Sequence, residues 1–131
     1  MILDTSYLLD LKSGDPSAFE RGVEMQEQDV VQRVTVISVT ELHYGAQFLQ
    51  SEDERRRVRN LVRAYPLVSI DERTAVRAAE LVADADRRND GSSGVESEDG
   101  YIGAVADQFG EPVLTRNVDD FEKLGVDVET Y

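Results

Sequence analysis

The chain has 131 residues and no cysteine, and its 27 acidic against 14 basic side chains give a formal net charge of −13. This length fits one compact domain, expected over residues 1–131, and the lack of cysteine excludes a disulfide framework, a thiolate metal site and a cysteine nucleophile. No apolar run approaches the roughly 18 residues of a membrane span and the start of the chain lacks a signal-peptide pattern, so we expect a cytoplasmic protein with no membrane partner.

Short apolar runs alternate with helical patterns through the first half of the chain. The run at 1–4 predicts a buried strand that leads directly into a helix over 5–11, and the β-branched run at 34–37 predicts a second strand. Asp15 and Pro16 are typical of a helix start, because an aspartate can cap a helix and a proline suits its first position. Two further helices are expected at 38–49 and 51–65.

The second half of the chain continues the alternation. The expected order is strand 67–70, helix 71–88, helix 97–109, strand 113–115, a short helix 119–124 and a weak strand 126–128. Residues 89–94, rich in Gly and Ser, form the one clearly flexible stretch. Strands that alternate with helices predict an α/β fold, in which a central, mostly parallel sheet of four to five strands is flanked by helices on both faces.

The charge bears on the class of substrate. A net charge of −13 predicts long-range repulsion from nucleic acid. However, an acidic, cysteine-free chain whose only lysines are Lys12 and Lys123 resembles proteins from salt-loving organisms. In molar salt the Debye length falls to about 3 Å, so the overall charge hardly reaches an approaching polyanion. The acidity therefore weakens a nucleic-acid function without excluding it.

Ligands of open parallel sheets bind beyond the carboxyl ends of the strands, and several acidic residues end or follow the expected strands or, like Asp99, lie in the first turn of a late helix. They are Asp4, Glu41, Asp99 and the pair Asp119 and Asp120. Carboxylates that converge at one edge repel each other unless a metal ion or protons intervene. Mg²⁺ and Mn²⁺ prefer oxygen ligands, and an ion held by carboxylates can polarise a phosphoryl oxygen and generate hydroxide from water. The pattern suits metal-assisted hydrolysis of phosphodiesters.

Each of these acids also has a purely structural interpretation. Asp4 could cap the helix that follows it, and an acid at Asp99 complements a helix dipole. Ser38 and Glu41 have the spacing of a capping box. Asp4 is the hardest to explain in this way, because a carboxylate on a buried strand is costly unless a cation or another partner compensates its charge.

Four segments resemble the sequence motifs of PIN-domain ribonucleases, in order and at the family spacing from end to end of the chain. They are Asp4-Thr5-Ser6-x-Leu8-Leu9, Ser38-Val39-Thr40-Glu41-Leu42-x-Tyr44-Gly45-Ala46, Asp99-Gly100-Tyr101-Ile102-Gly103-Ala104 and Leu114-Thr115-Arg116-Asn117-x-x-Asp120-Phe121. The length also resembles that of VapC-type toxins of toxin–antitoxin pairs. One motif alone is weak, whereas four in sequence are a specific signal.

The resemblance implies a metal-dependent endoribonuclease with a PIN-like α/β fold. Asp4 and Asp99 would be the main ligands of one Mg²⁺ or Mn²⁺ ion, with Glu41 completing the pocket directly or through water. Thr5 or Ser6 could offer a hydroxyl to the metal shell or to the substrate. A metal-activated water would attack single-stranded RNA.

The fourth motif departs from the commonest pattern of the family. Many PIN domains carry an acid where Asn117 stands, whereas VapC-like members often have Asn there and an acid three residues later, which is Asp120 here. Asn117 can still form hydrogen bonds to the substrate, and Asp120 can supply the charge. Arg116 follows the expected strand beside the proposed metal, where a guanidinium could hold a phosphate.

The resemblance also implies partners: an RNA substrate, a cognate antitoxin that inserts an element into the acidic groove, and a second copy of the chain in a homodimer. Two alternatives stay open. One is a PIN nuclease of RNA processing that has no antitoxin. The other is a non-catalytic α/β binding module, whose acids serve only as helix caps and as a halophilic surface.

Other residues have competing interpretations. The stripe Arg55, Arg59 and Arg63 is interpreted as an exposed face that pairs with nearby acids, with an RNA-guiding ridge or an antitoxin-docking surface as the alternative. Gly45 is interpreted as a point of close packing. His43, the single histidine, is interpreted as structural rather than as a general base.

Overall fold

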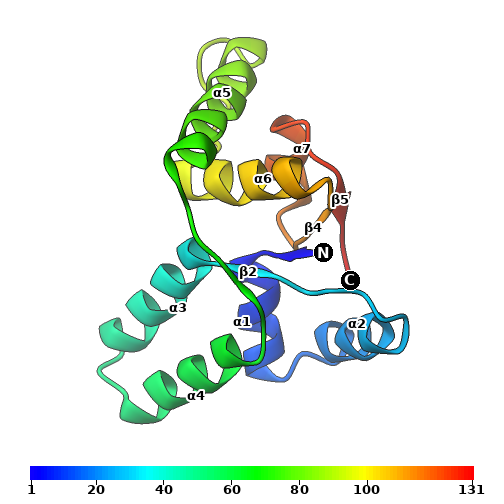
Figure 1. Ribbon diagram of the computed structural model, residues 1–131. Coiled ribbons are helices and arrows are strands. Elements are labelled where there is room, and N and C mark those ends of the chain that lie inside the picture. The colour runs from blue at the N-terminus through cyan, green and yellow to red at the C-terminus, as the bar shows by residue number, and fades with distance from the viewer.

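The computed structural model describes residues 1–131 and confirms the α/β fold, with short strands between helices (Figure 1). The elements in chain order are β1 (Ile2–Leu3), α1 (Thr5–Ser13), α2 (Pro16–Glu27), β2 (Val34–Thr35), α3 (Val36–Phe48), α4 (Glu52–Arg63), β3 (Leu67–Val68), α5 (Glu72–Arg88), α6 (Ser97–Phe109), β4 (Val113–Leu114), α7 (Val118–Lys123) and β5 (Val128–Glu129). No helix is both long and apolar enough to cross a membrane.

The strands are parallel but do not form the single sheet of four to five strands that we expected. Three of them make one sheet in the order β1-β4-β5, and β2 pairs with β3 in a second. A single parallel bridge between Ile2 and Arg33 links the two. Each strand has only two residues, so each pair of neighbouring strands is joined over only two residues. Between β1 and β2 the pairing is reduced to the one bridge, which is why the strands form two sheets.

The clearest boundary error lies at β2, where the β-branched run at 34–37 predicted a strand. The strand ends at Thr35 and α3 begins at Val36, two residues earlier than expected. The cause is a helix cap: the Thr35 hydroxyl accepts a hydrogen bond from the backbone N–H of Ser38 at 3.4 Å. This cap satisfies one of the free N–H groups of the first helical turn.

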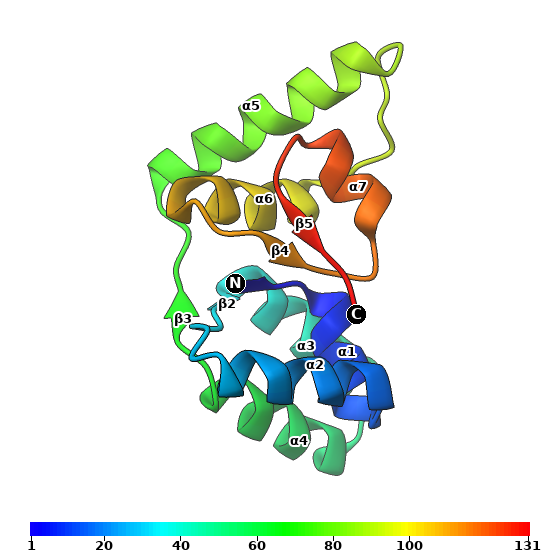
Figure 2. The same ribbon diagram turned by 90° about the vertical axis from the view of Figure 1, so that its right-hand side faces the viewer.

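The sheet separates two apolar clusters, and successive residues of its strands enter opposite ones. Ile2 and Val113 pack with α5, α6 and α7, whereas Leu3 and Leu114 pack with side chains of α1 to α4. This is the alternation that a strand with both faces buried requires. Figure 2 shows the result, with α5 to α7 on one side of the strands and α1 to α4 on the other.

Helices α5 and α6 make close contact at Gly100, which is adjacent to Asp99. A Cβ atom at Gly100 would lie 2.6 Å from Cγ2 of Val82 and 3.5 Å from the carbonyl oxygen of Ala78. The helices therefore approach as closely as they do because residue 100 has no side chain. Gly45, which we had interpreted as a packing glycine, has no atom within 4 Å of the equivalent position, so that interpretation was wrong.

Replacing Gly100 by Ala is expected to lower the free energy of unfolding by about 1–3 kcal/mol, because the stiff side chain of Val82 cannot move aside without strain. Urea unfolding measures the change. Gly45→Ala is the matched control, and it should be neutral or stabilising by about 0.5–1 kcal/mol, since alanine is the better helix former. Equal losses in the two variants, or no recovery on adding Val82→Ala to Gly100→Ala, would contradict the packing argument.

Candidate active site

Asp4 is the most deeply buried acid of the site, with 2% of its surface exposed. Its backbone N–H donates to the carbonyl oxygen of Leu114 at 3.0 Å, which holds it at the ends of β1 and β4. It occupies the N-cap position of α1, yet its side chain makes no capping bond. Oδ2 instead accepts hydrogen bonds from Ser6 Oγ and Thr115 Oγ1, each at 2.7 Å, and Oδ1 accepts none.

The hydroxyls of Ser6 and Thr115 also fix the loop that follows β4. Ser6 Oγ accepts the backbone N–H of Arg116 at 3.0 Å, and Thr115 Oγ1 accepts that of Asn117 at 2.8 Å. The start of α1 and the end of β4 are thereby joined around Asp4. Our sequence interpretation did not single out Thr115, although its place as the last residue of an expected strand and in the fourth motif was a usable signal.

Glu41 lies on α3 opposite the first turn of α1. Its Oε1 accepts a hydrogen bond from Thr5 Oγ1 at 2.8 Å, and Thr5 Oγ1 also lies 2.9 Å from Ser38 Oγ. The capping-box interpretation of Glu41 was wrong, because Ser38 is already inside α3 and Thr35 is the cap. Burial raises the pKa of Glu41, and the charges of Asp4, Glu98 and Glu96 add to this, against the hydrogen bond from Thr5.

Asp99 is the third residue of α6 and has neither a hydrogen bond nor an ion pair for its carboxylate. Burial raises its pKa to about 7, and the negative charges of Asp4, Asp120 and Glu41 contribute in that order. The carboxylates of motifs far apart in the sequence are thus close enough to repel one another. An acid in the first turn does complement the helix dipole, but here that effect does not offset the burial and the repulsion.

Glu96 and Glu98 are two acids of the site that our sequence interpretation missed. They line a cleft of about 490 Å³ together with Thr5, Glu41 and other residues of α1, α3 and α6. Both also raise the pKa of Glu41 by their charge, and Glu96 that of Asp99. Three acids within the four residues 96–99 were the available signal.

Asp4, Glu41 and Asp99 are called the acid cluster here, and the residues of the fourth motif lie beside it. Asp120 is half-buried in the first turn of α7 and its charge raises the pKa of Asp99, whereas Asn117 is exposed at the N-cap position without a capping bond. Of these two, Asp120 is therefore the one that acts on the acid cluster. Arg116 does not turn toward that cluster: its Nη1 lies 2.5 Å from Oδ1 of Asp10.

The acid cluster forms no ready-made group of three or more acidic or histidine ligands for a metal ion, so Asp4, Glu41 and Asp99 do not make a closed cage. The donor set instead fits a hard cation such as Mg²⁺, which is held by one or two carboxylates and keeps several waters. Asp4 Oδ1 has no partner in the chain, and Asp99 has none at all. A cation between them would also relieve the repulsion that raises the pKa of Asp99.

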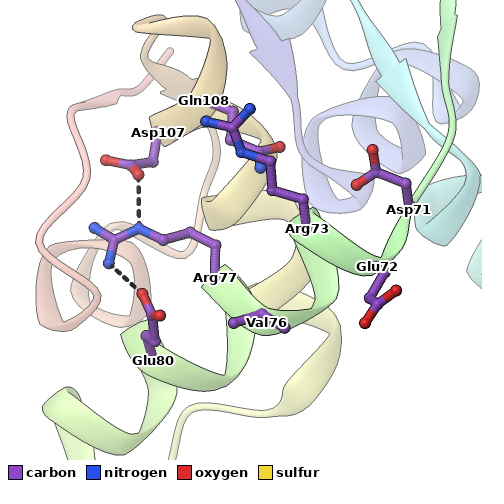
Figure 3. A pocket seen from close by; sticks show the side chains of 8 residues that line it. All are labelled: Asp71, Glu72, Arg73, Val76, Arg77, Glu80, Asp107 and Gln108. Atoms are coloured by element: carbon purple, nitrogen blue, oxygen red, sulfur yellow. Dashed lines mark hydrogen bonds and ion pairs between the residues drawn. The ribbon is translucent and has the colours of Figure 1, made fainter.

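A larger hollow of about 1000 Å³ lies elsewhere, between the start of α5 and the end of α6, and contains none of the expected site residues (Figure 3). The charge of the Arg77 guanidinium in this hollow is already neutralised, because Arg77 donates to Asp107 at 2.7 Å and to Glu80 at 3.1 Å. Asp107 and Asp99 stand near opposite ends of α6. This hollow therefore plays no part in the acid cluster.

The structural interpretation of the arginine stripe of α4, an exposed face that pairs with nearby acids, is met at Arg55 alone. Arg55 forms an ion pair with Glu52 and also donates to Gln47 at 3.2 Å. Arg59 and Arg63 are exposed and form no ion pair. None of the three lines the cleft beside Glu41.

Replacing Asp99 by Asn is expected to stabilise the metal-free protein at neutral pH. The folded state raises the pKa of Asp99 to about 7, so its contribution to stability is present at low pH and is lost as the pH rises from about 4 through 7. After allowance for solvent screening, the variant should gain about 1–2 kcal/mol at pH 8, which is a few degrees in Tm.

Thermal unfolding with a chelator between about pH 4 and 8 measures this gain. Asp119→Asn, at an exposed acid of the same sign, is the control and should show no gain that grows with pH. A gain for Asp99→Asn that is absent, or that is largest at pH 4, would contradict the electrostatic account.

Comparison with known proteins agrees with this architecture. The PIN domain family model matches residues 1–127. The fold is similar to that of DNA-bound VapBC from Salmonella typhimurium, with a TM-score of 0.81 and 22% identity over 98% of this chain and 96% of that one. It is also similar to VapBC2 from Rickettsia felis bound to a promoter fragment, with a TM-score of 0.83 and 15% identity over 99% and 97% of the two chains.

A third similar structure is VapBC-1 from nontypeable Haemophilus influenzae, with a TM-score of 0.76 and 18% identity over 98% of this chain and 96% of that one. No curated protein matches the sequence. Identities this low support the fold alone, whereas the family match spans nearly the whole chain. The chain therefore belongs to the PIN domain family.

Proposed function

We propose that this PIN-domain protein is a metal-dependent endoribonuclease that hydrolyses phosphodiester bonds of single-stranded RNA, and that residues 1–131 act as one domain. One observation carries the proposal: the charges of Asp4, Glu41 and Asp120 all raise the pKa of Asp99, and no basic side chain pairs with any of these four carboxylates. Such an arrangement is unfavourable on its own and becomes favourable with a bound cation. The resemblance of the four motifs to those of PIN ribonucleases supports RNA as the substrate.

In this proposal Asp4 and Asp99 hold one Mg²⁺ or Mn²⁺ ion, and Glu41 completes the site directly or through water. Ser6 and Thr115 hold Oδ2 of Asp4, so that Oδ1 would remain available to the ion. Asp120 adds negative charge beside Asp99. When bound, the ion would polarise the scissile phosphate and lower the pKa of water, which supplies the nucleophile.

The hydroxyls of Thr5 and Ser6 are occupied within the chain, because Thr5 contacts Glu41 and Ser38, and Ser6 contacts Asp4 and the backbone of Arg116. We therefore assign them to the positioning of the carboxylates rather than to direct contact with RNA. Arg116 and Asn117, which are exposed, are assigned to the phosphate groups of the substrate.

We further propose that the chain is the toxin of a VapBC-type pair, inhibited by a cognate antitoxin, and that it forms a homodimer. Two of the similar structures are described as a toxin–antitoxin complex from Klebsiella pneumoniae and as a VapBC toxin–antitoxin member from Mycobacterium tuberculosis. A small reading frame adjacent to this gene, whose product abolishes cleavage when co-purified, is the expected partner. Absence of such a frame would favour an RNA-processing nuclease without an antitoxin.

The parent protein is expected to cut internally labelled single-stranded RNA in Mg²⁺ or Mn²⁺ and to lose this activity with a chelator. Asp4→Asn and Asp99→Asn should each reduce the rate by about 100-fold or more, because each removes a charge that the ion requires. Asp119→Asn, prepared in parallel, controls for a contaminating nuclease and should cut at the parent rate. Equal cleavage by all four proteins, or no cleavage by the parent, would overturn the proposal.

Mn²⁺ is expected to raise the Tm of the parent, and by more at pH 8 than at pH 6. The pKa of Asp99 is about 7 without metal, so below that pH the ion must displace a proton and its affinity should fall about tenfold per pH unit. Thermal unfolding at a series of Mn²⁺ concentrations measures this linkage. A shift in Tm that is unchanged in Asp99→Asn, or that is independent of pH, would contradict the proposed ligands.

A further inference from the structure

The guanidinium of Arg116 is held at two points along one face of α1. Ser6 and Asp10 are four residues apart in this helix, so their side chains project from the same face. Ser6 Oγ accepts the backbone N–H of Arg116 at 3.0 Å, and Oδ1 of Asp10 lies 2.5 Å from Nη1 of Arg116. Backbone and side chain of this arginine are thus both fixed with respect to α1, whose N-cap residue is Asp4.

Asp10 is itself fixed by Tyr131, which follows β5. The Tyr131 hydroxyl donates to Oδ2 of Asp10 at 2.5 Å. The Tyr131 ring packs edge-on against Tyr7, with ring centroids 5.1 Å apart, and Tyr7 is fully buried. A continuous set of contacts therefore runs from the core through Tyr131 and Asp10 to Arg116.

Exposure differs sharply along this set of contacts. The side chain of Asp10 is 16% exposed and that of Arg116 is 59% exposed. Both oxygens of Asp10 are occupied, so Asp10 is not available as a metal ligand. Arg116 uses only Nη1, and its other guanidinium N–H groups have no partner in the chain. They are free to donate to an oxyanion.

The residue that carries these free N–H donors, Arg116, lies close to the carboxylates of the site. Arg116 is joined to Asp4 through Ser6 and Thr115. It also lines a hollow of about 330 Å³ together with Asn117 and Asp120. Asp10 lies about 9 Å along the helix axis from Asp4, at 1.5 Å per residue. Arg116 is the basic residue bound into this network, and its free donors can attract a polyanion that approaches the carboxylates.

We propose that Asp10 and Tyr131 are positioning residues that orient Arg116 as a clamp for a backbone phosphate of single-stranded RNA. This inference rests on the proposed ribonuclease function. It assigns a role to two residues outside the four motifs. An ion pair as exposed as this one contributes little to stability, whereas an arginine oriented beforehand loses less freedom when it binds a phosphate.

Binding of a fluorescein-labelled single-stranded RNA to the Asp99→Asn protein, which cannot cleave it, tests the clamp by anisotropy. Arg116→Ala should weaken binding about 5–10-fold, and should reduce the slope of log K against log salt by about 0.7, the value of one phosphate contact on a single strand. Tyr131→Phe should weaken binding about 2–5-fold. Arg73→Ala, which removes an exposed arginine in the hollow of Figure 3 that forms no ion pair, is the matched control and should change neither quantity.

A double-mutant cycle separates positioning from a general structural effect. If Tyr131 acts through Arg116, Tyr131→Phe should change binding less than about 1.5-fold once Arg116 is Ala. In the protein that retains Asp99, and therefore cleaves RNA, Arg116→Ala and Tyr131→Phe should each raise KM and leave kcat within about twofold. Asp10→Asn provides a second variant and should resemble Tyr131→Phe.

The outcomes distinguish this inference from the function on which it rests. Failure of the parent to cleave RNA with Mn²⁺ overturns the proposed function and the clamp with it. Cleavage by the parent, together with an Arg116→Ala salt slope equal to that of Arg73→Ala, overturns the clamp alone. An effect of Tyr131→Phe that persists in the Arg116→Ala background overturns the positioning role of Tyr131.

Discussion

The two hydrogen bonds that Ser6 and Thr115 donate to Asp4 are the interaction on which the rest of the site depends. They place a nearly inaccessible carboxylate at the point where β1 and β4 end, and they satisfy only one of its oxygens. A buried carboxylate without a cation is costly. The same two hydroxyls accept the N–H groups of Arg116 and Asn117, so the geometry of the fourth motif follows from the geometry of the first.

The arrangement of the carboxylates lowers the stability of the metal-free protein at neutral pH. Asp99 gains burial and four nearby negative charges without gaining a hydrogen bond, and Gly100 allows α5 to approach α6 directly beside it. The apolar clusters on both sides of the strands supply the rigidity that keeps these carboxylates close. The site therefore combines a well-packed frame with an electrostatic strain that a divalent cation would relieve, as is common where charged groups are arranged for chemistry.

The sequence was sufficient for the features that local patterns encode. The order of strands and helices, the parallel α/β fold and the family followed from β-branched runs, helix starts and the four motifs. What it could not provide were contacts between hydroxyls and carboxylates across long stretches of chain. Thr115 meets Asp4 across 111 residues and Thr5 meets Glu41 across 36. Local pattern also misled us at Glu41, where the spacing from Ser38 resembled a cap although the actual cap is Thr35.

The most direct test of the central claim is the location of Mn²⁺ by anomalous scattering in crystals of the protein. The account predicts one strong peak within bonding distance of Asp4 and Asp99, no peak at Asp10, and loss of the peak in crystals of Asp99→Asn. A peak on other acids of this strongly acidic surface, with none between Asp4 and Asp99 at a saturating Mn²⁺ concentration, would contradict it.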